Sequence, residues 1–268
     1  MLEENSVYSA ERKQEILKLI QKDTRVTVVQ LAELFQVSRA TIRRDLGELR
    51  RVGLLQRTYG GAISAGHAAQ AGPNDGVERP FLERKAISCE EKKAIGQAAA
   101  KLVRPGDTIF LDGGTTIECM TSFLVDIPHL TVITSGLNIA MRLVGNEGIT
   151  VIVIGGTLHH RSLLLTGVLA TEFIQGANLH FDTAFIAASA VSAAAGVTNA
   201  SLEEIPIKRQ AVAAARQVVL LADSSKLGRT AAMRVVPAER IHRLITDAKA
   251  PVAEVEALRQ LGVVVDLV

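Results

Sequence analysis

The sequence predicts two folds in one chain: a small winged helix-turn-helix at the N-terminus and a larger α/β domain with a mostly parallel sheet. Residues 10–62 show three apolar patterns at helical spacing, followed by a glycine-rich hairpin signal. Residues 81–268 instead alternate short apolar runs with helical patterns, which is typical of a parallel sheet covered on both faces. Residues 63–80 are rich in Ala, Gly and polar residues without periodicity. We therefore predict domains at 1–62 and 81–268, joined by a linker at 63–80.

The composition argues against several classes of protein. The chain has 268 residues, of which 48% are hydrophobic, which is enough for one or two domains with buried cores. Two cysteines, Cys89 and Cys119, are too few for a disulfide framework or a four-thiolate zinc site. The first residues are acidic rather than apolar, and no stretch reads as a membrane span. We therefore expect a cytoplasmic protein without a membrane partner and without a cofactor.

Charge is distributed unevenly between the two predicted domains. Residues 1–62 contain 11 Lys and Arg against 8 Asp and Glu, whereas residues 63–268 contain 19 against 20. The excess of positive charge in the small N-terminal part suggests an anionic partner for that part alone.

The helices of the first domain are predicted from apolar spacing and from capping residues. Apolar residues recur at helical spacing in the first two helices: Ile16, Leu17 and Ile20, and then Val28, Leu31, Ala32, Leu34 and Phe35. Thr27 and Gln30 match a capping box, and Ser38 is a good N-cap for a third helix. Three residues of that helix face inward: Ile42, Leu46 and Leu49. Residues 54–57 and the segment after Gly61 are predicted to pair as a hairpin.

The third helix carries side chains that suit the major groove of DNA. Short side chains at its first turn let the backbone approach the groove, while arginines reach phosphates or guanine edges. The predicted contact set contains six residues: Ser38, Arg39, Thr41, Arg43, Arg44 and Arg57. The alternative is a solvated charged face, in which Glu48 pairs with Arg44 four residues before it.

The stretch 11–62 closely resembles the winged helix-turn-helix of DeoR-family bacterial transcription factors. The resemblance is most specific in VSRATIRRDLGEL, residues 37–49. It implies that the first five residues of the contact set meet operator DNA, and that Arg57 with Gly60 and Gly61 belongs to the wing.

The second domain is predicted as alternating strands and helices. The strands are expected at 108–111, 130–133, 150–154, 183–187, 218–222, 243–246 and 263–266, and the helices at 90–103, 116–125, 138–144, 202–216 and 252–261. Residues 162–175 fit either a strand or a helix.

Five of these strands end in small, polar or glycine-rich sequences. They are DGGTT at 112–116, TSGLN at 134–138, GGT at 155–157, ASA at 188–190 and DSSK at 223–226. Parallel strands end at one edge of a sheet, where ligands bind. In DGGTT, Gly113 and Gly114 allow an anion to approach the backbone, and two threonines open a helix whose free amides favour phosphate. Lys226 adds a cation, although a tight turn and a surface lysine are the simpler alternatives.

Residues 81–248 also resemble the sensor domain of the DeoR family. The matching stretches are GDTIFLDGGTT, LTVITSGLNIA, VIGGTL, FDTAFIAASAV, LEEIPIKRQAV and VVLLADSSKLGR. The resemblance implies a fold similar to ribose-5-phosphate isomerase and coenzyme A transferases, with a phosphorylated sugar or polyol as effector. It implies contact roles for eight residues: Asp112, Gly114, Thr115, Thr116, Ser135, Asn138, Gly156 and Lys226. Ser135 departs from the Asn of many relatives, and residues 192–199 lack acidic and aromatic side chains suited to sugar hydroxyls.

Other polar groups have simpler interpretations. His159 and His160 lack acidic or thiol partners at ligand spacing, so we expect a solvated loop and no metal site. Glu203, Glu204 and Lys208 lie at helical spacing and are expected to form an i, i+4 pairing, although the family motif there could line the pocket.

These observations predict a DNA-binding transcriptional repressor of a sugar or polyol catabolic operon, released by a phosphorylated sugar. Paired recognition helices must reach neighbouring half-sites, so we expect a homodimer or homotetramer. No catalytic residue is expected. One alternative is a sugar-phosphate isomerase-like enzyme fused to a DNA-binding module, in which Asp112, Asp223 and Lys226 act as acid and base. Another is a constitutive DNA-binding protein with a vestigial sensor.

Overall fold

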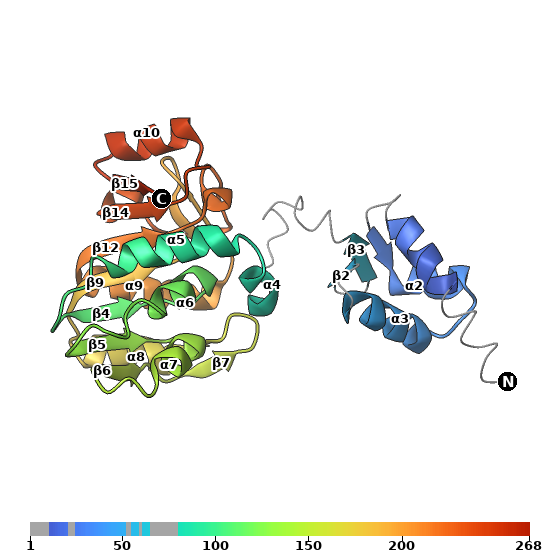
Figure 1. Ribbon diagram of the computed structural model, residues 1–268, viewed down its shortest axis with the longest axis horizontal. Coiled ribbons are helices and arrows are strands. Elements are labelled where there is room, and N and C mark those ends of the chain that lie inside the picture. The colour runs from blue at the N-terminus through green and yellow to red at the C-terminus, as the bar shows by residue number, and fades with distance from the viewer. Residues whose placement is uncertain (1–10, 21–24, 52–54, 59–60, 65–79) are drawn as a thin grey trace. The chain divides into compact units, whose positions relative to one another are not determined.

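The computed structural model describes residues 11–20, 25–51, 55–58, 61–64 and 80–268. The chain divides into two compact units, Met1–Asn74 and Asp75–Val268, and each is described by itself (Figure 1). Most of the predicted linker, residues 65–79, lies outside the described residues. Residues 63 and 64, which were predicted as linker, instead continue a strand of the first unit, because they pair with Gln56 and Leu55.

The first unit contains the three predicted helices and the predicted hairpin. Residues 11–20 are helical, and they are followed by β1 (Arg25–Thr27), α2 (Val28–Leu34), α3 (Arg39–Arg51), β2 (Leu55–Thr58) and β3 (Gly61–Ser64). The three strands form an antiparallel sheet in the order β1-β3-β2, of which β1 was not predicted. Ile16, Ile20, Leu31, Ile42 and Leu46 are at most 1% exposed and form the centre of the core.

Capping residues fix where the helices of the first unit begin. The Gln30 backbone amide donates to Thr27 Oγ1 at 3.2 Å, and the Thr27 amide donates to Gln30 Oε1 at 3.1 Å, which confirms the predicted capping box. Leu34 belongs to the apolar run that predicted this helix, but it does not contribute to the core. Leu34 is the last residue of α2 and is 59% exposed, so the buried face of this short helix consists of Val28 and Leu31.

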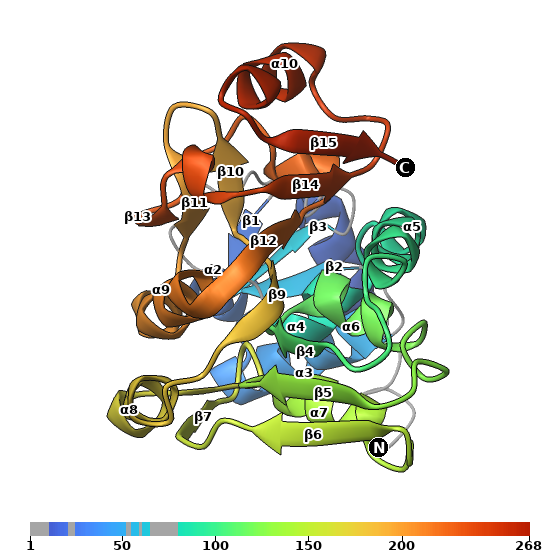
Figure 2. The ribbon, with the colours of Figure 1, turned by 90° about the vertical axis from the view of Figure 1, so that its left-hand side faces the viewer.

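The second unit is built on a seven-stranded parallel sheet in the order β15-β14-β12-β9-β4-β5-β6. All seven predicted strands are present: β4 (Thr108–Leu111), β5 (Leu130–Thr134), β6 (Ile149–Val153), β9 (Phe181–Ile186), β12 (Ala215–Leu221), β14 (Arg243–Thr246) and β15 (Val264–Leu267). Helices cover both faces (Figure 2). The α/β fold with a parallel sheet is therefore confirmed.

Two core clusters correspond to the two faces of the sheet. One cluster joins the strands to α5 (Cys89–Ala100), α6 (Thr115–Thr121) and α7 (Leu137–Leu143). The other joins them to α8 (Val168–Gly176), α9 (Ile205–Ala214) and α10 (Val252–Gln260). The predicted helix at 202–216 is wrong at both ends. Residues 202–204 form a 3-10 turn, η2, and Ala215 already begins β12, where it pairs with Phe181.

Several small elements of the second unit were not predicted. They are α4 (Phe81–Lys85), the antiparallel hairpin of β7 (Thr157–His159) and β8 (Leu164–Thr166), and a small sheet of β10 (Ala190–Ser192), β11 (Gly196–Asn199) and β13 (Met233–Val236). The ambiguous stretch 162–175 contains both types of structure, because β8 is followed directly by α8.

Across the described residues, every helix is too short or too polar to cross a membrane.

Candidate nucleic-acid interface and effector site

The third helix of the first unit has one buried and one exposed face. Ile42, Leu46 and Leu49 are buried, as predicted. The opposite face presents four exposed residues of the predicted contact set: Ser38, Arg39, Arg43 and Arg44. Ser38 acts as the predicted N-cap, because its Oγ accepts the Thr41 backbone amide at 3.1 Å and lies 2.9 Å from Thr41 Oγ1. The Ser38 and Thr41 hydroxyls therefore also set the first turn of α3.

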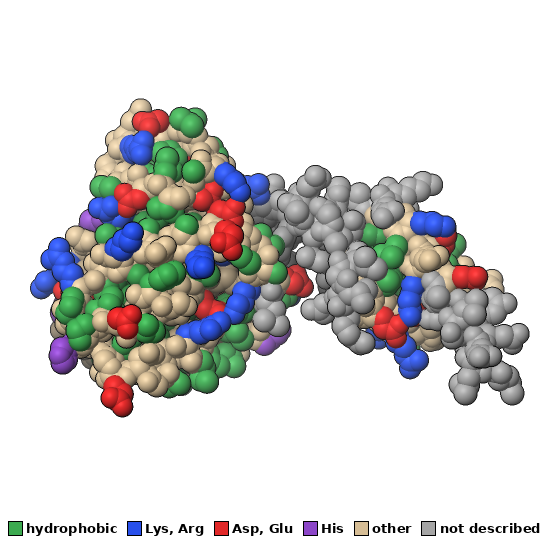
Figure 3. Space-filling model, viewed as in Figure 1, with side chains coloured by type: hydrophobic (Ala, Val, Ile, Leu, Met, Phe, Trp, Pro, Cys, Tyr) green, Lys and Arg blue, Asp and Glu red, His purple; other side chains and the backbone are tan. Residues whose placement is uncertain are grey.

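The acidic residues of α3 are paired with basic residues on the helix behind it. Arg12 Nε lies 2.6 Å from the buried carboxylate of Asp45, and the Lys13 ammonium pairs with Glu48. Arg44, which could have paired with Glu48, takes part in no ion pair among the described residues. These pairs leave the exposed face of α3 with its arginine charge, and Figure 3 shows Lys and Arg side chains at the surface of this unit.

The wing is only partly described. Arg57 lies in β2 opposite Ala62 of β3, but its side chain lies outside the described residues, as does Gly60. The contact role of Arg57 stays a prediction.

In the second unit, the loop after β4 fits tightly against its neighbours. Gly114 precedes α6 with φ of 108°, a conformation that favours glycine. A Cβ on Gly113 would lie 2.2 Å from Leu164 Cδ2 of β8. Gly113 therefore makes room for the β7–β8 hairpin, and its role in admitting an anion stays a prediction.

Three predicted effector contacts are buried hydroxyl residues at adjacent strand ends. Thr115 and Thr116 follow β4 and are 6% and 7% exposed, and Ser135 follows β5 and is 1% exposed. Within the described part of the chain, none of these three hydroxyls takes part in a hydrogen bond. Because each hydroxyl can both donate and accept a hydrogen bond, this group is well suited to bind a polar ligand.

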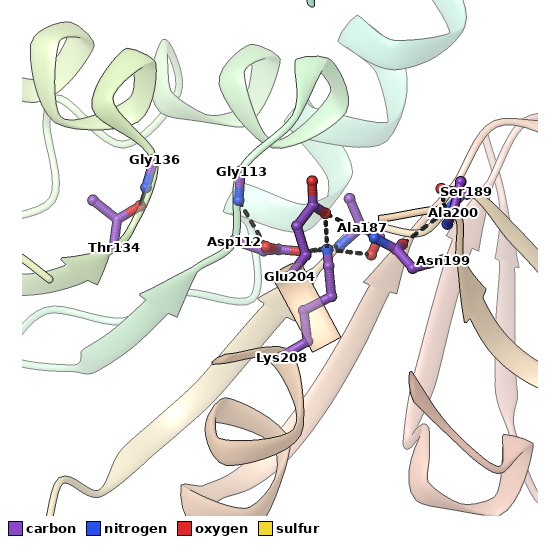
Figure 4. A network of polar contacts seen from close by, with 10 residues as sticks. All are labelled: Asp112, Gly113, Thr134, Gly136, Ala187, Ser189, Asn199, Ala200, Glu204 and Lys208. Carbon is purple, nitrogen blue, oxygen red and sulfur yellow. Dashed lines mark hydrogen bonds and ion pairs between the residues drawn. The ribbon is translucent and has the colours of Figure 1, made fainter. Parts of the chain in front are cut away.

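Asp112 is already fully engaged by its own chain. Its Oδ1 accepts the Gly113 amide at 2.8 Å, and its Oδ2 accepts the Ala187 amide at 2.9 Å and the Lys208 ammonium (Figure 4). Lys208 also donates to the Ala187 carbonyl at 3.0 Å and lies 3.7 Å from Glu204, which confirms the predicted i, i+4 pair. The Asp112 carboxylate therefore ties the end of β4 to the end of β9 and to α9.

The same polar network reaches the small antiparallel sheet. Asn199 donates from Nδ2 to Glu204 Oε2 at 2.7 Å, and its Oδ1 accepts the Ser189 amide at 3.2 Å (Figure 4). Asn199 is 2% exposed. The predicted site contains neither Asn199 nor Lys208. The only sequence signal for this network was the helical spacing of Glu204 and Lys208.

A second buried carboxylate, Glu118 on α6, was also missed. Its Oε1 accepts from Lys85 Nζ at 2.6 Å and from Arg142 Nε at 3.2 Å, and its Oε2 accepts from Asn138 Nδ2 at 3.1 Å. Burial alone would raise the pKa of Glu118, but the hydrogen bonds from Lys85, Asn138 and Arg142 outweigh it, and the pKa is lowered. The ionised carboxylate thus joins α4, α6 and α7.

The remaining predicted contacts lie farther along the same edge. Gly156, with φ of 152°, follows β6, and a Cβ there would lie 2.5 Å from the Thr166 carbonyl, so it closes the β7–β8 hairpin. Lys226 ends η3 (Ser224–Lys226), which Asp223 caps after β12. One strand, β9, separates β12 from β4. The pKa of Lys92 on α5 is lowered, mainly because its ammonium group is buried. The charge of Asp223 opposes this shift, and the charge of Lys226 adds to it.

The described residues contain no group of three or more His, Cys, Asp and Glu side chains that could hold a metal ion. The rings of His159 and His160 stack at 6.2 Å.

Comparison with known families matches both units. Residues 12–67 match the model of a DeoR-like helix-turn-helix domain, and residues 87–248 match the model of the DeoR C-terminal sensor domain. The second match alone covers more than half of the chain.

Full-length relatives are transcriptional regulators by name. The glycerol-3-phosphate regulon repressor of Escherichia coli (strain K12) is 32% identical, over 91% of this chain and 92% of that protein. The HTH-type transcriptional repressor GlcR of Bacillus subtilis (strain 168) is 35% identical, over 90% of this chain and 89% of its own length.

Solved structures match at lower identity. Ribose 5-phosphate isomerase A from Methanocaldococcus jannaschii is 19% identical with a TM-score of 0.38, over 51% of this chain and 53% of that chain. The eIF2B delta subunit from Chaetomium thermophilum is 16% identical with a TM-score of 0.41, over 54% and 51%.

Proposed function

The chain belongs to the DeoR family of transcriptional regulators, and we propose that it represses a sugar or polyol catabolic operon until a phosphorylated sugar or polyol releases it from DNA. The observation that carries the effector part of this proposal is the group of hydroxyls on three largely buried residues, Thr115, Thr116 and Ser135, which make no hydrogen bond among the described residues. Hydroxyls that the chain itself leaves available can donate to and accept from a polyhydroxylated anion.

The exposed face of α3 supports operator binding. Arg39, Arg43 and Arg44 carry positive charge on one exposed face, while the acidic residues of the helix are neutralised from behind. Phosphate contacts by arginine give affinity, and contacts to base edges give sequence specificity. The protein would act in the cytoplasm as a homodimer or homotetramer, because operators present paired half-sites. Sedimentation in the presence and absence of operator DNA measures that state.

The loop that begins α6 supports a phosphate site. Gly114 has no side chain to cover the start of α6, Thr115 and Thr116 offer hydroxyls, and Lys226 supplies a cation from the β12 end of the same edge. Charge-assisted hydrogen bonds to phosphate are about twice as strong as neutral ones, so the phosphate would fix the effector. Ser135 and Asn138, at the adjacent strand end, would then face the sugar. Asp112 would act by positioning this loop rather than by contact.

The arrangement also suggests how effector binding could be transmitted toward the linker. Glu118 lies one turn after Thr115 and Thr116 and holds Lys85 of α4, the first described element after residues 65–79. Phe81 of α4 donates to the Arg161 carbonyl at 2.7 Å, and so ties α4 to the hairpin over the site. An effector that shifts α6 or the hairpin would therefore shift α4. Lys85→Met should leave effector binding intact and weaken DNA release, and unchanged release would exclude this route.

The carboxylates that an isomerase would need are committed elsewhere, which favours a regulator over an enzyme. Both oxygens of Asp112 accept hydrogen bonds within the chain. Asp223 is 3% exposed and accepts the Ser225 amide at 3.1 Å as the cap of η3. A general base must reach the substrate proton, and these hydrogen bonds instead support structural roles for both carboxylates.

Two measurements with the full-length chain test this function. An operator selected from a random DNA pool should be footprinted at specific positions, and ribose 5-phosphate, glycerol 3-phosphate and related phosphates should be screened for thermal stabilisation without turnover. A ligand that binds only the folded state raises its stability. Steady conversion of any of these phosphates, lost in Lys226→Ala, would replace the regulator with the enzyme.

A further inference from the structure

The β7–β8 hairpin lies directly on the loop after β5. The Leu137 amide donates to the Leu163 carbonyl at 3.0 Å, and the Leu165 amide donates to the Ser135 carbonyl at 2.8 Å. Between these bonds, Gly136 and Leu164 form an antiparallel bridge. Asn138 and Ser162 are the chain neighbours of the bonded pair Leu137 and Leu163, so both side chains branch from this junction.

Two buried polar atoms at this junction are unsatisfied. Ser162 is 2% exposed, and its Oγ is buried without a hydrogen-bond partner in the described part of the chain. The same is true of the Asn138 Oδ1 atom. Buried unpaired oxygens are rare in folded proteins, and two that adjoin one junction indicate a place where something else supplies the hydrogen bonds.

The ion-paired carboxylate of Glu118 fixes which end of the Asn138 amide faces the junction. A carboxylate only accepts hydrogen bonds, so the Asn138 Nδ2 group must face Glu118, at 3.1 Å. The Oδ1 atom therefore points the other way, and lies 3.2 Å from the position that a Cβ of Gly136 would occupy. This places an acceptor on the strand-end side of α7, beside the loop after β5.

We propose that Asn138 Oδ1 and Ser162 Oγ form a subsite for one hydroxyl group of the effector. The hydroxyl donates to Asn138 Oδ1 and accepts from Ser162, which uses both oxygens. A phosphate at neutral pH mainly accepts hydrogen bonds and would oppose the Asn138 oxygen, so the subsite takes a sugar or polyol hydroxyl and excludes the phosphate. The inference rests on the proposed function and makes Ser162 a specificity-determining residue.

The test compares Ser162→Ala with the wild-type full-length chain and with Ser122→Ala, an exposed serine of the same unit. The probes are glycerol 3-phosphate, ribose 5-phosphate, fructose 1-phosphate and inorganic phosphate, measured by calorimetry. For the sugar or polyol phosphate that binds wild type most tightly, Ser162→Ala should lose about two- to tenfold in affinity, the value of one hydrogen bond. Affinity for inorganic phosphate, and all affinities of Ser122→Ala, should not change.

A second comparison identifies the hydroxyl. Analogues of the binding phosphate that each lack one hydroxyl are titrated into both proteins. One analogue should bind wild type more weakly than the complete phosphate does. The affinity of that analogue should be the same for Ser162→Ala as for wild type. The ligand-free melting temperature of Ser162→Ala should be unchanged or higher, because an unsatisfied hydroxyl has been removed.

The subsite would be overturned if every analogue lost the same affinity in wild type as in Ser162→Ala, or if Ser162→Ala bound the phosphate as tightly as wild type. A buried water would then satisfy the two oxygens. Failure of wild type to bind any of the phosphates would instead overturn the proposed function itself, and the subsite with it.

Discussion

The two candidate sites of this chain are built in opposite ways. On α3, the chemistry lies on the exposed face, where Arg43 and Arg44 project into solvent while Asp45 and Glu48 are neutralised from behind. At the strand ends of the second unit, the polar residues are largely buried, and Thr115, Ser135 and the Asn138 Oδ1 atom keep hydrogen-bonding capacity that the described residues do not use. An exposed cationic face binds by many screened, individually small contacts, whereas a buried polar site depends on a few unscreened ones. The loss of DNA binding caused by a substitution in the first site should therefore be partial and depend on salt concentration. A substitution in the second site should nearly abolish the response to the effector.

The sharpest way to test this contrast is Thr115→Asp. It puts a carboxylate where the phosphate would bind, and the repulsion is poorly screened because the residue is 6% exposed. The variant should fold and bind operator DNA normally, yet fail to release it at any effector concentration. Thr230→Asp, on an exposed loop, is the matched control and should respond like wild type. Normal induction of Thr115→Asp would reduce the DGGTT loop to a structural turn.

Lys208→Met tests whether the buried network holds the site together. Removing one partner of a buried ion pair leaves the other charge uncompensated and typically costs about 3–5 kcal/mol. Because Asp112 keeps two backbone donors, we expect about 3 kcal/mol in urea unfolding of the second unit. Lys249→Met removes an exposed pair with Glu91 and should not move the same transition. A shift no larger for Lys208→Met than for Lys249→Met would show that the network is dispensable.

Arg43→Ala and Arg44→Ala test the exposed site. An arginine on phosphate should weaken binding to all sequences and lower the salt slope by about one, whereas an arginine on a base should cost about 1–3 kcal/mol and relax one operator position. Footprinting titrations at several salt concentrations separate the two. Lys101→Ala, exposed on the second unit, provides the control. Binding unaltered in both arginine variants would remove α3 from the interface.

The smallest effect is expected at Glu118, whose pKa is lowered because the hydrogen bonds from Lys85, Asn138 and Arg142 outweigh burial. A carboxyl group with a lowered folded pKa stabilises the protein above its unfolded pKa and loses that contribution as pH falls through the folded value. Glu118→Gln should therefore cost about 1 kcal/mol at pH 7, since Lys85 and Arg142 can turn to water, and the difference from wild type should shrink below about pH 4.5. Denaturant midpoints at pH 7 and pH 3.5 measure it, and a difference that grew on acidification would contradict the assigned charge.

Local patterns predicted the parts of the fold that depend on neighbouring residues. β4 and β14 have the predicted bounds, because each is an apolar run set between polar residues. The capping box of Thr27 and the buried seam of α3 were also predicted correctly. The end of α9 was not, since Ala215 continues the helical pattern and joins the sheet only through pairing with Phe181.

The site was predictable only where its residues follow directly after strands. The resemblance to the DeoR family pointed to Thr115, Ser135 and Asn138, and the strand ends explain why they gather at one edge. Lys208 meets Asp112 across 96 positions of sequence, and Leu164 fills the space above Gly113 from an unpredicted hairpin. Contacts of this kind depend on the folded topology, and no local pattern reveals them.

The central claim is that the buried polar edge of the sheet binds a phosphorylated ligand and thereby releases the exposed face of α3 from DNA. The most direct measurement is the fluorescence anisotropy of a labelled operator bound to the full-length chain, titrated with one sugar in its phosphorylated and free forms. We expect the phosphorylated form to release the operator at a concentration at least about 100-fold lower, because the charge-assisted contacts are absent from the free sugar. Equal release by both forms, or release by neither across the tested sugars, would contradict it.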